Sequence, residues 1–235
     1  MKLDNATVLI TGANRGLGLA FAREALARGA RKVYAAARDP ASVTLAGVVP
    51  LKLDVTRPAD IAAAAAQAGD VTLLINNAGI ASLGGFLNED SAEAAQRMLD
   101  TNFFGPMRLS QAFAPILARH GGGAILNVLS VASWINGPLL GAYGASKSAA
   151  WALTNGLRID LTAQGTQVLG LHAGFIDTDL TKGIDFPKST PEAIVKAAFD
   201  GLEAGASEVL ADDISRAVHQ GLSANPAVYL QAIER

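Results

Sequence analysis

The feature that most constrains the fold of this chain is a glycine-rich turn near its start, placed between a strand pattern and a helix pattern. Residues 6–10 form a short apolar, β-branched run that is typical of a buried strand. Residues 11–18 follow at once, and a helical pattern then continues to Leu26, with Gly29 as a candidate C-cap. Strand, glycine turn and helix in this order predict a phosphate site, because backbone N–H groups and the positive helix end face the anion.

The spacing of the glycines differs from the commonest dinucleotide fingerprint. Gly12, Gly16 and Gly18 form G-x-x-x-G-x-G rather than G-x-G-x-x-G. Three glycines could also serve a tight turn alone. The flanking strand and helix favour the approach of a pyrophosphate instead.

The rest of the chain alternates between strand and helix patterns. Further strands are expected at residues 32–37, 48–53, 71–75, 124–129, 167–172 and 208–211. Helices are expected around residues 62–66 and over 91–119, 143–163 and 191–203. Continuous apolar strands alternating with helices predict an α/β fold, a doubly wound parallel sheet of Rossmann type in three α/β/α layers.

The chain shows no linker and no repeat, so one domain is expected over residues 1–235. Within it, residues 1–120 would bind the cofactor and residues 121–211 would carry catalysis and the substrate site. A helical tail is expected over residues 212–235. This tail could close the substrate site or pack against a partner subunit, and the sequence leaves both open.

The residues after the second strand bear on the type of cofactor. NAD sites carry an acidic residue about 20 positions beyond the glycines, whereas an arginine accommodates the 2′-phosphate of NADP. Arg38 lies twenty residues past Gly18, and Arg15 could be a second guanidinium for the phosphate. The sequence therefore favours NADP(H). A register shift of one would place Asp39 at the ribose, and Arg15 could be a solvated surface residue.

A second pattern, far along the chain, concerns catalysis. Tyr143 and Lys147 are four residues apart, so on a helix they share one face and the ammonium can lie beside the phenol. A free tyrosine titrates near pH ~10, and a neighbouring cation favours the phenolate. Tyr143 is therefore a candidate general acid or base. Ser130, thirteen residues upstream, could hold a substrate oxygen at the same centre.

Composition argues against several other functions. The formal net charge is −2, so neither nucleic acid nor an anionic membrane is indicated as a partner. Cysteine is absent, and the three histidines (His120, His172 and His219) lack metal-ligand spacing, so no metal is implied. His172, at the end of a strand, is expected to be structural. Residues 121–146 are uncharged, but their polar side chains favour a strand and an active-site loop over a membrane span.

Four separated motifs stand in the order found in one family, the short-chain dehydrogenases/reductases. They are residues 11–18, Asn76-Asn77-Ala78-Gly79, Asn102, and Ser130 with Tyr143-x-x-x-Lys147. Over about residues 5–212 the chain resembles members of this family that reduce carbonyl compounds with NADPH.

The resemblance implies a role for each catalytic residue. Tyr143 would be the acid/base, Lys147 would lower its pKa and bind the nicotinamide ribose, and Ser130 would orient the carbonyl. Asn102 would hold a water in a proton relay. The cofactor-binding positions expected from pattern and resemblance are Gly12, Asn14, Arg15, Gly16, Leu17, Gly18, Arg38, Asp54, Val55, Asn76, Ala78, Gly79, Tyr143, Lys147, Gly174, Ile176 and Thr178. Asp54 would meet the adenine amino group, or else cap the next helix.

The chain departs from the family pattern in two places. Leu129 precedes Ser130 where serine is frequent, without changing the spacing to Tyr143. Ala173 stands where proline is usual, which loosens the turn that carries Ile176 and Thr178. The following stretch, 178–191, is short for a substrate lid and suggests an open or shallow site. Its underside could be lined by Phe175, Leu180, Ile184 and Phe186, or these could be ordinary packing residues.

These interpretations predict an NADPH-dependent reductase of a ketone or aldehyde. A cytoplasmic location is expected because the start of the chain has no signal-peptide pattern. By resemblance the protein would be a homodimer or homotetramer. One alternative is an NAD-dependent alcohol dehydrogenase of the same fold. Another is a nucleotide-binding sensor or signalling protein with little catalysis.

Overall fold

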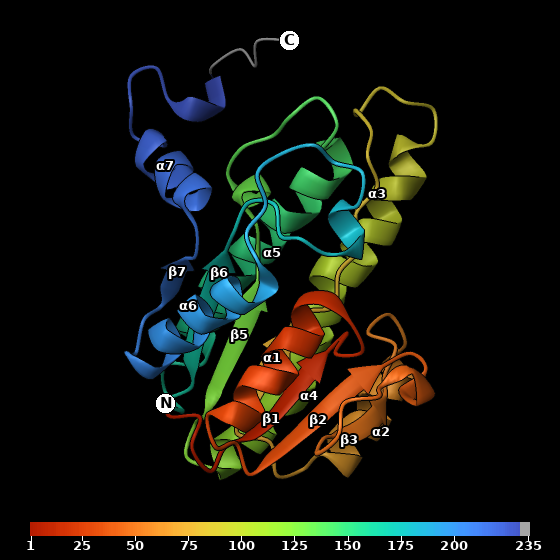
Figure 1. The fold of residues 1–235 in the computed structure, drawn as a ribbon, viewed down its shortest axis with the longest axis vertical. Helices are drawn as coiled ribbons and strands as arrows, with labels where there is room; N and C mark the ends of the chain where they lie inside the picture. Colours follow the sequence, from red (N-terminus) through yellow and green to blue (C-terminus); the bar gives the residue numbers. More distant parts are fainter. Residues whose placement is uncertain (231–235) are drawn as a thin grey trace.

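A single parallel sheet of seven strands, covered by helices on both faces, organises the computed structural model (Figure 1), which describes residues 1–230. The strand order is β3-β2-β1-β4-β5-β6-β7. The strands are β1 (Thr7–Thr11), β2 (Lys32–Ala37), β3 (Val49–Lys52), β4 (Leu73–Asn76), β5 (Ala124–Val128), β6 (Gln167–His172) and β7 (Glu208–Leu210). The main helices are α1 (Gly16–Ala27), α2 (Pro58–Gln67), α3 (Ser91–Leu99), α4 (Gly105–Arg119), α5 (Gly141–Asp160), α6 (Pro191–Glu203) and α7 (Asp213–Gly221). The expected doubly wound α/β fold is confirmed.

The strands are apolar throughout because successive side chains enter two separate cores. Val8 and Ile10 of β1 pack with α1 and α6 on one face, while Leu9 packs with α2 and α4 on the other. Phe21 and Phe199 meet edge to face, with ring centroids 5.3 Å apart, and so join α1 to α6.

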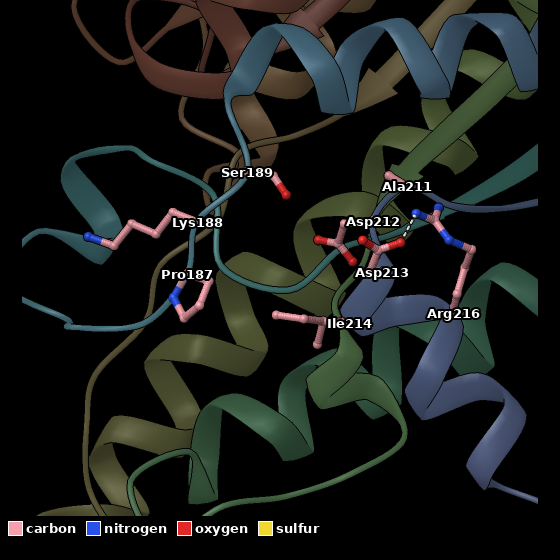
Figure 2. Close-up of a pocket in the computed structure, with 8 residues that line it drawn as sticks. All are labelled: Pro187, Lys188, Ser189, Ala211, Asp212, Asp213, Ile214 and Arg216. Carbon is pink, nitrogen blue, oxygen red and sulfur yellow. Dashed lines mark hydrogen bonds and ion pairs between the residues drawn. The ribbon is translucent and has the colours of Figure 1, made fainter.

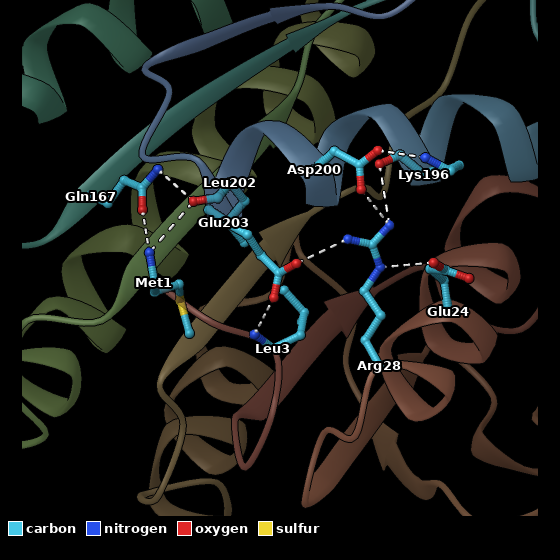
Figure 3. Close-up of polar contacts among 9 residues, drawn as sticks. All are labelled: Met1, Leu3, Glu24, Arg28, Gln167, Lys196, Asp200, Leu202 and Glu203. Carbon is cyan, nitrogen blue, oxygen red and sulfur yellow. Dashed lines mark hydrogen bonds and ion pairs between the residues drawn. The ribbon is translucent and has the colours of Figure 1, made fainter.

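Charged side chains connect the N-terminal segment to helices α1 and α6, which cover the same face of the sheet (Figure 3). Arg28, just after α1, binds Glu24, Asp200 and Glu203 at 2.8, 2.8 and 3.1 Å. Glu203 also accepts a hydrogen bond from the backbone N–H of Leu3 at 3.0 Å. Because the Arg28 side chain is mostly buried, these bonds are worth more than solvent-exposed ion pairs.

The sequence predicts one helical region over residues 91–119, and the structure interrupts it. A π-helical turn, Asp100–Phe104, lies between α3 and α4. A π turn inserts an extra residue into the helical ladder and is frequent at functional sites. Here it holds Asn102, which is buried.

The tail forms one short helix, α7, and a 3-10 turn, Val228–Leu230. Asp212 caps α7 by accepting a hydrogen bond from Ser215 N at 2.8 Å. The last part of the expected tail, residues 231–235, lies outside the described residues. Within residues 1–230, no helix is both long and apolar enough to cross a membrane.

Candidate active site

The predicted site residues gather where the parallel strands end. The strand order reverses between β1 and β4, since the chain leaves β1 towards β2 and returns to the other side of β1 with β4. Ligands of open α/β sheets bind in the crevice at such a reversal. The glycine turn follows β1, the Asn76–Gly79 motif spans the end of β4, and Ser130 lies just past β5.

The glycine turn has the geometry that a dinucleotide phosphate requires. Gly12 and Gly16 have φ angles of 66° and 53°, which favour glycine. A Cβ on Gly18 would lie 2.1 Å from the Gly12 carbonyl oxygen, so α1 packs on the turn only with glycine there. The first turn of α1, all of it described, contains no acidic residue that would repel an anion. Asn14 lies in this turn, and Leu17 is buried beneath it.

Two residues to which the sequence assigned no role hold this turn in place. Asn77 Nδ2 donates to the Thr11 carbonyl at 2.8 Å. The Thr11 hydroxyl accepts hydrogen bonds from the backbone N–H groups of Asn77 and Ala78 at 3.0 and 2.9 Å. The glycine turn is thereby bonded to the end of β4. The sequence signal that could have identified this contact is a polar residue at the end of each of two neighbouring strands, Thr11 in β1 and Asn77 after β4.

The two candidate residues for the expected ribose position differ in their contacts. Arg38 is exposed directly after β2. The neighbouring Asp39 carboxylate caps a 3-10 turn, accepting from Ala41 N at 3.0 Å, which occupies it locally. Arg15 is also exposed and forms a 3.0 Å ion pair with Asp179. Such a pair contributes little, so a phosphate could displace it.

Asp54 lies at the end of the next strand and binds its own loop. Its Oδ1 accepts from the Thr56 hydroxyl at 2.7 Å and from Thr56 N at 3.0 Å. Burial raises the pKa of Asp54, but these hydrogen bonds and the charges of Arg38 and Arg57 outweigh it, so the pKa lies below its ordinary value. The carboxylate therefore shapes the turn leading to α2. Val55 is buried and packs against Gly105, where a larger residue would contact the Val55 side chain too closely.

Three of the four predicted catalytic residues meet at one point. Ser130 follows β5, while Tyr143 and Lys147 lie in the first two turns of α5. The Ser130 hydroxyl lies close enough to the Tyr143 phenol to lower the pKa of that phenol. Lys147 is 6% exposed; its Nζ donates to the Val128 carbonyl at 2.8 Å and lies 5.9 Å from the centre of the Tyr143 ring.

The electrostatics of this centre differ from the sequence expectation. Burial raises the pKa of Tyr143, and the neighbouring Ser130 hydroxyl offsets this only in part. Lys147 was expected to lower the Tyr143 pKa, but its ammonium is bound to Val128 rather than to the phenol oxygen. Burial lowers the pKa of Lys147 itself to about 8. The phenol therefore stays protonated at neutral pH and can donate a proton.

Asn102 joins the loop after β4 to α5. Its Oδ1 accepts from Ile80 N, and its Nδ2 donates to the Ile80 carbonyl and to the Ser146 hydroxyl, each at 2.9 Å. Gly79 lies so close that a Cβ there would be 3.3 Å from Asn102 Oδ1. Asn102 thus holds Gly79 and Ile80 at the rim of the crevice. The water relay that the resemblance implies stays a prediction.

Asn76 is buried and bonded to the neighbouring strand, and its predicted contact with the cofactor stays a prediction. Its Nδ2 donates to Asn127 Oδ1 at 2.8 Å, and Asn127 Nδ2 donates to the Thr154 hydroxyl at 2.9 Å. All three side chains are buried. They form a polar chain from β4 through β5 to α5. Neither Asn127 nor Thr154 was singled out from the sequence as a site residue.

The turn after β6 is held by the tail. Gly174 N donates to Asp212 Oδ2 at 2.7 Å, and Ile214 packs against Gly174. Figure 2 shows a hollow beside this turn, between residues 187–189 and the start of α7. Ile176 pairs with Ser189, and Thr178 caps the short turn that follows it. The start of the tail therefore lies beside the loop between β6 and α6, in which the substrate lid was expected.

Ala173, the position without the usual proline, keeps a regular hydrogen bond. Its carbonyl accepts from Val131 N at 3.0 Å. The turn after β6 is therefore bonded to the turn after Ser130 without proline. The placement of Ile176 and Thr178 follows from this contact and from the Asp212 bond.

Three loops above the centre expose large apolar side chains. The loops follow β4, β5 and β6 and lie together at one end of the sheet in Figure 1, in yellow, green and cyan. Gly84 N donates to the Leu139 carbonyl at 2.9 Å, which joins the first two loops. Phe175 and Phe186 stack at 5.3 Å in the third. The exposed members are Leu83, Phe86, Leu87, Leu139, Leu180 and Phe186. We call this set the apolar rim.

Across residues 1–230, no group of His, Cys, Asp or Glu side chains is arranged to hold a metal ion.

The sequence was compared with protein families and with known proteins. A family model described as short chain dehydrogenase matches residues 6–188. The chain is 36% identical over 195 residues to dehydrogenase/reductase SDR family member 7B of Bos taurus, covering 75% of this chain and 60% of that protein. It is 37% identical over 191 residues to galactitol 2-dehydrogenase (L-tagatose-forming) of Cereibacter sphaeroides, covering 77% of this chain and 75% of that protein.

A solved structure agrees over nearly the whole chain. The crystal structure of a short chain dehydrogenase from Burkholderia cenocepacia J2315 in complex with NADP matches with a TM-score of 0.94 and 36% identity, covering 99% of this chain and 100% of that one. The chain therefore belongs to the short-chain dehydrogenase/reductase family. The chain spans 60% of the length of the bovine relative.

Proposed function

We propose that this protein is an oxidoreductase that reduces a ketone or aldehyde to an alcohol with NADPH. The observation that carries the proposal is the placement of Ser130 beside Tyr143 in a crevice that has a dinucleotide-type glycine turn. A pure nucleotide binder has little use for a phenol and a buried ammonium at this place. When bound, the nicotinamide would supply a hydride to the carbonyl carbon.

The protein's own groups would handle the oxygen and the proton. Ser130 would donate a hydrogen bond to the carbonyl oxygen, and Tyr143 would transfer its proton to that oxygen as the hydride reaches carbon. Burial keeps the Tyr143 pKa high, so the proton is present at neutral pH. Lys147, whose Nζ lies 5.9 Å from the centre of the Tyr143 ring, would favour the phenolate left behind through its positive charge. The carbonyl compound thereby gains one hydride at carbon and one proton at oxygen and becomes the alcohol.

The NADP preference is proposed from the groups past β2. Arg38 is exposed and so available to a 2′-phosphate, whereas the Asp39 carboxylate is occupied by its own turn. Arg15 would be a second contact once released from Asp179. The relative from Burkholderia cenocepacia was solved with NADP, which supports the same preference. An NAD-dependent alcohol dehydrogenase remains the alternative.

The apolar rim supports a substrate with apolar substituents. Leu87 is fully exposed, and Phe186 is 62% exposed, although both are strongly hydrophobic. Covering such side chains with an alkyl or aryl group contributes roughly 25 cal/mol per Å² of area removed from water. A polyhydroxylated ketone would lose hydration there without gaining partners. We therefore propose an uncharged, apolar ketone or aldehyde. A cytoplasmic homodimer or homotetramer is proposed on the family resemblance.

A paired cofactor assay tests these proposals. NADPH and NADH oxidation would be followed with a panel of apolar and polyhydroxylated ketones and aldehydes, for wild type and for Arg38→Asp. We expect NADPH-selective turnover of apolar members. We expect Arg38→Asp to lose about 10- to 100-fold in kcat/KM with NADPH, since a charge-assisted phosphate contact is worth about 1.5–3 kcal/mol. Arg57→Asp, a nearby charge change outside the proposed contact, is the matched control.

The alternatives give different outcomes in the same assay. Turnover with NADH alone would assign the protein to the NAD-linked class. Measurable NADPH binding without turnover of any panel member would support the sensor instead.

A further inference from the structure

His172, the last residue of β6, is fully buried directly behind Ser130. Its Nδ1 lies 3.1 Å from the Ser130 carbonyl oxygen, and its Nε2 lies 3.1 Å from Oε1 of Glu208 on β7. The Trp134 ring stacks on the imidazole, with centroids 3.8 Å apart and planes 16° apart. The ring is thus held on three sides, and nothing in the proposed reaction uses it.

Ser130 and Trp134, which both contact His172, stand at the two ends of one short turn. The 3-10 turn Val131–Ser133 has Ser130 as its N-cap and Trp134 as its C-cap. Ser130 Oγ accepts from Ala132 N at 3.1 Å within the turn. The direction of the Ser130 hydroxyl therefore depends on the placement of this turn. His172 holds the turn at its first carbonyl and at its last side chain.

Both ring nitrogens of His172 face oxygen acceptors. A neutral imidazole carries one N–H and can donate to one of them, whereas the doubly protonated ring donates to both. The other charged or titratable groups near the Glu208 carboxylate are Arg158 on α5 and His219 on α7, the latter 4.0 Å from Glu208 Oε2.

We propose that His172 is a positioning residue of the reductase: its Nδ1–H bond to the Ser130 carbonyl keeps the Ser130 hydroxyl on Tyr143. The proposal rests on the proposed function. It requires His172 to act on the rate of the chemical step through Ser130. Binding of NADPH at the glycine turn is independent of this bond.

Two substitutions separate the bond to Ser130 from the bond to Glu208. In His172→Asn the amide nitrogen takes the place of Nδ1 and can donate to the Ser130 carbonyl. In His172→Gln the amide takes the place of Nε2, so the Glu208 contact is kept and the Ser130 bond is lost. Neither variant keeps the ring stacked on Trp134. The difference between them therefore isolates the bond to Ser130.

The experiment measures kcat and the KM for NADPH of wild type and both variants with the best ketone of the panel. We expect His172→Asn to keep kcat within about threefold and His172→Gln to lose about tenfold, the worth of one hydrogen bond, with the KM for NADPH unchanged in both. Equal loss in both variants, or a greater loss in His172→Asn, would overturn the proposal. Absence of wild-type turnover would instead defeat the proposed function, and the positioning role with it.

A third variant, Trp134→Leu, covers the case in which the His172 variants fail to fold. Trp134→Leu removes the other contact of the turn without altering β6. We expect it to lower kcat several-fold with an unchanged KM for NADPH, and an unchanged kcat would overturn the proposal. Trp151→Phe leaves Trp134 as the single tryptophan, because the chain has two. Its emission then reports whether the stack on His172 is present in the protein under assay.

Discussion

The floor of the crevice and its rim are built in opposite ways. Asn102, Ser130 and Lys147 are 2%, 8% and 6% exposed, and each is hydrogen-bonded to protein groups. On the rim, Leu87 and Phe186 are exposed and lie on loops. Buried polar groups must be satisfied, so their positions are over-determined, whereas an exposed apolar side chain is held by few contacts.

This contrast divides the proposed function into two parts. The floor would set the reaction, because proton transfer needs groups held at hydrogen-bond distance. The rim would set which carbonyl compound enters, since apolar contact area is not directional. Substitutions in the floor should therefore change kcat, and substitutions in the rim should change KM.

The largest effect is expected from the floor, at Tyr143. Tyr143→Phe removes the proposed proton donor and keeps the ring, so kcat should fall by about 10²- to 10⁴-fold, the usual contribution of general acid catalysis. NADPH affinity, measured by fluorescence titration, should stay within about twofold. Retained turnover would show that the phenol is not the proton donor.

A second effect of the floor concerns stability. Burial lowers the pKa of Lys147 from 10.5 to about 8, so the charged form costs the folded state ~3 kcal/mol at neutral pH. Lys147→Met removes this cost and leaves the Val128 carbonyl without its donor. We expect an inactive protein that is about 1–3 kcal/mol more stable than wild type at pH 7, measured by urea unfolding.

The pH dependence distinguishes this cause from a general effect of packing. The unfolded chain binds more protons than the folded protein between pH 8 and 10.5, so the cost is complete below pH 8 and disappears as the pH rises to 10.5. The stability advantage of Lys147→Met should shrink across that window. A difference that stays constant with pH, or a variant less stable than wild type at pH 7, would contradict the account.

The smallest effect is expected on the rim. Phe186→Ser should raise the KM for an apolar ketone about fivefold, since it removes roughly 1 kcal/mol of apolar contact, and should leave kcat unchanged. A polyhydroxylated ketone assayed in parallel is the control, because its KM should not rise. Phe186→Leu should stay near wild type. A fall in kcat with unchanged KM would break the division between floor and rim.

The sequence predicted the floor better than the rim because the floor follows from strand ends. Strands β2 and β6 and helix α6 lie at the predicted residues, and the glycine turn and Ser130 follow from the rule for open α/β sheets. The π turn around Asn102 was not predicted, since the helical pattern continues through residues 91–119 and the break arises from bonds to Ile80 and Ser146.

Other features depend on contacts distant in sequence. The placement of Lys147 against the Val128 carbonyl, which separates its ammonium from the Tyr143 phenol, joins residues 19 positions apart. The Asp212 bond to Gly174 joins residues 38 positions apart. The spacing of residues along a helix predicts which side chains share a face, but it does not predict which carbonyl a buried ammonium binds.

The most direct test of the account is a single-turnover comparison of wild type and Tyr143→Phe. Enzyme in excess would be loaded with NADPH and mixed with an apolar ketone, and NADPH absorbance and alcohol would be measured together. The account predicts one alcohol per NADPH consumed by wild type, and bound but unconsumed NADPH in Tyr143→Phe. Equal consumption by both proteins, or none by wild type, would contradict it.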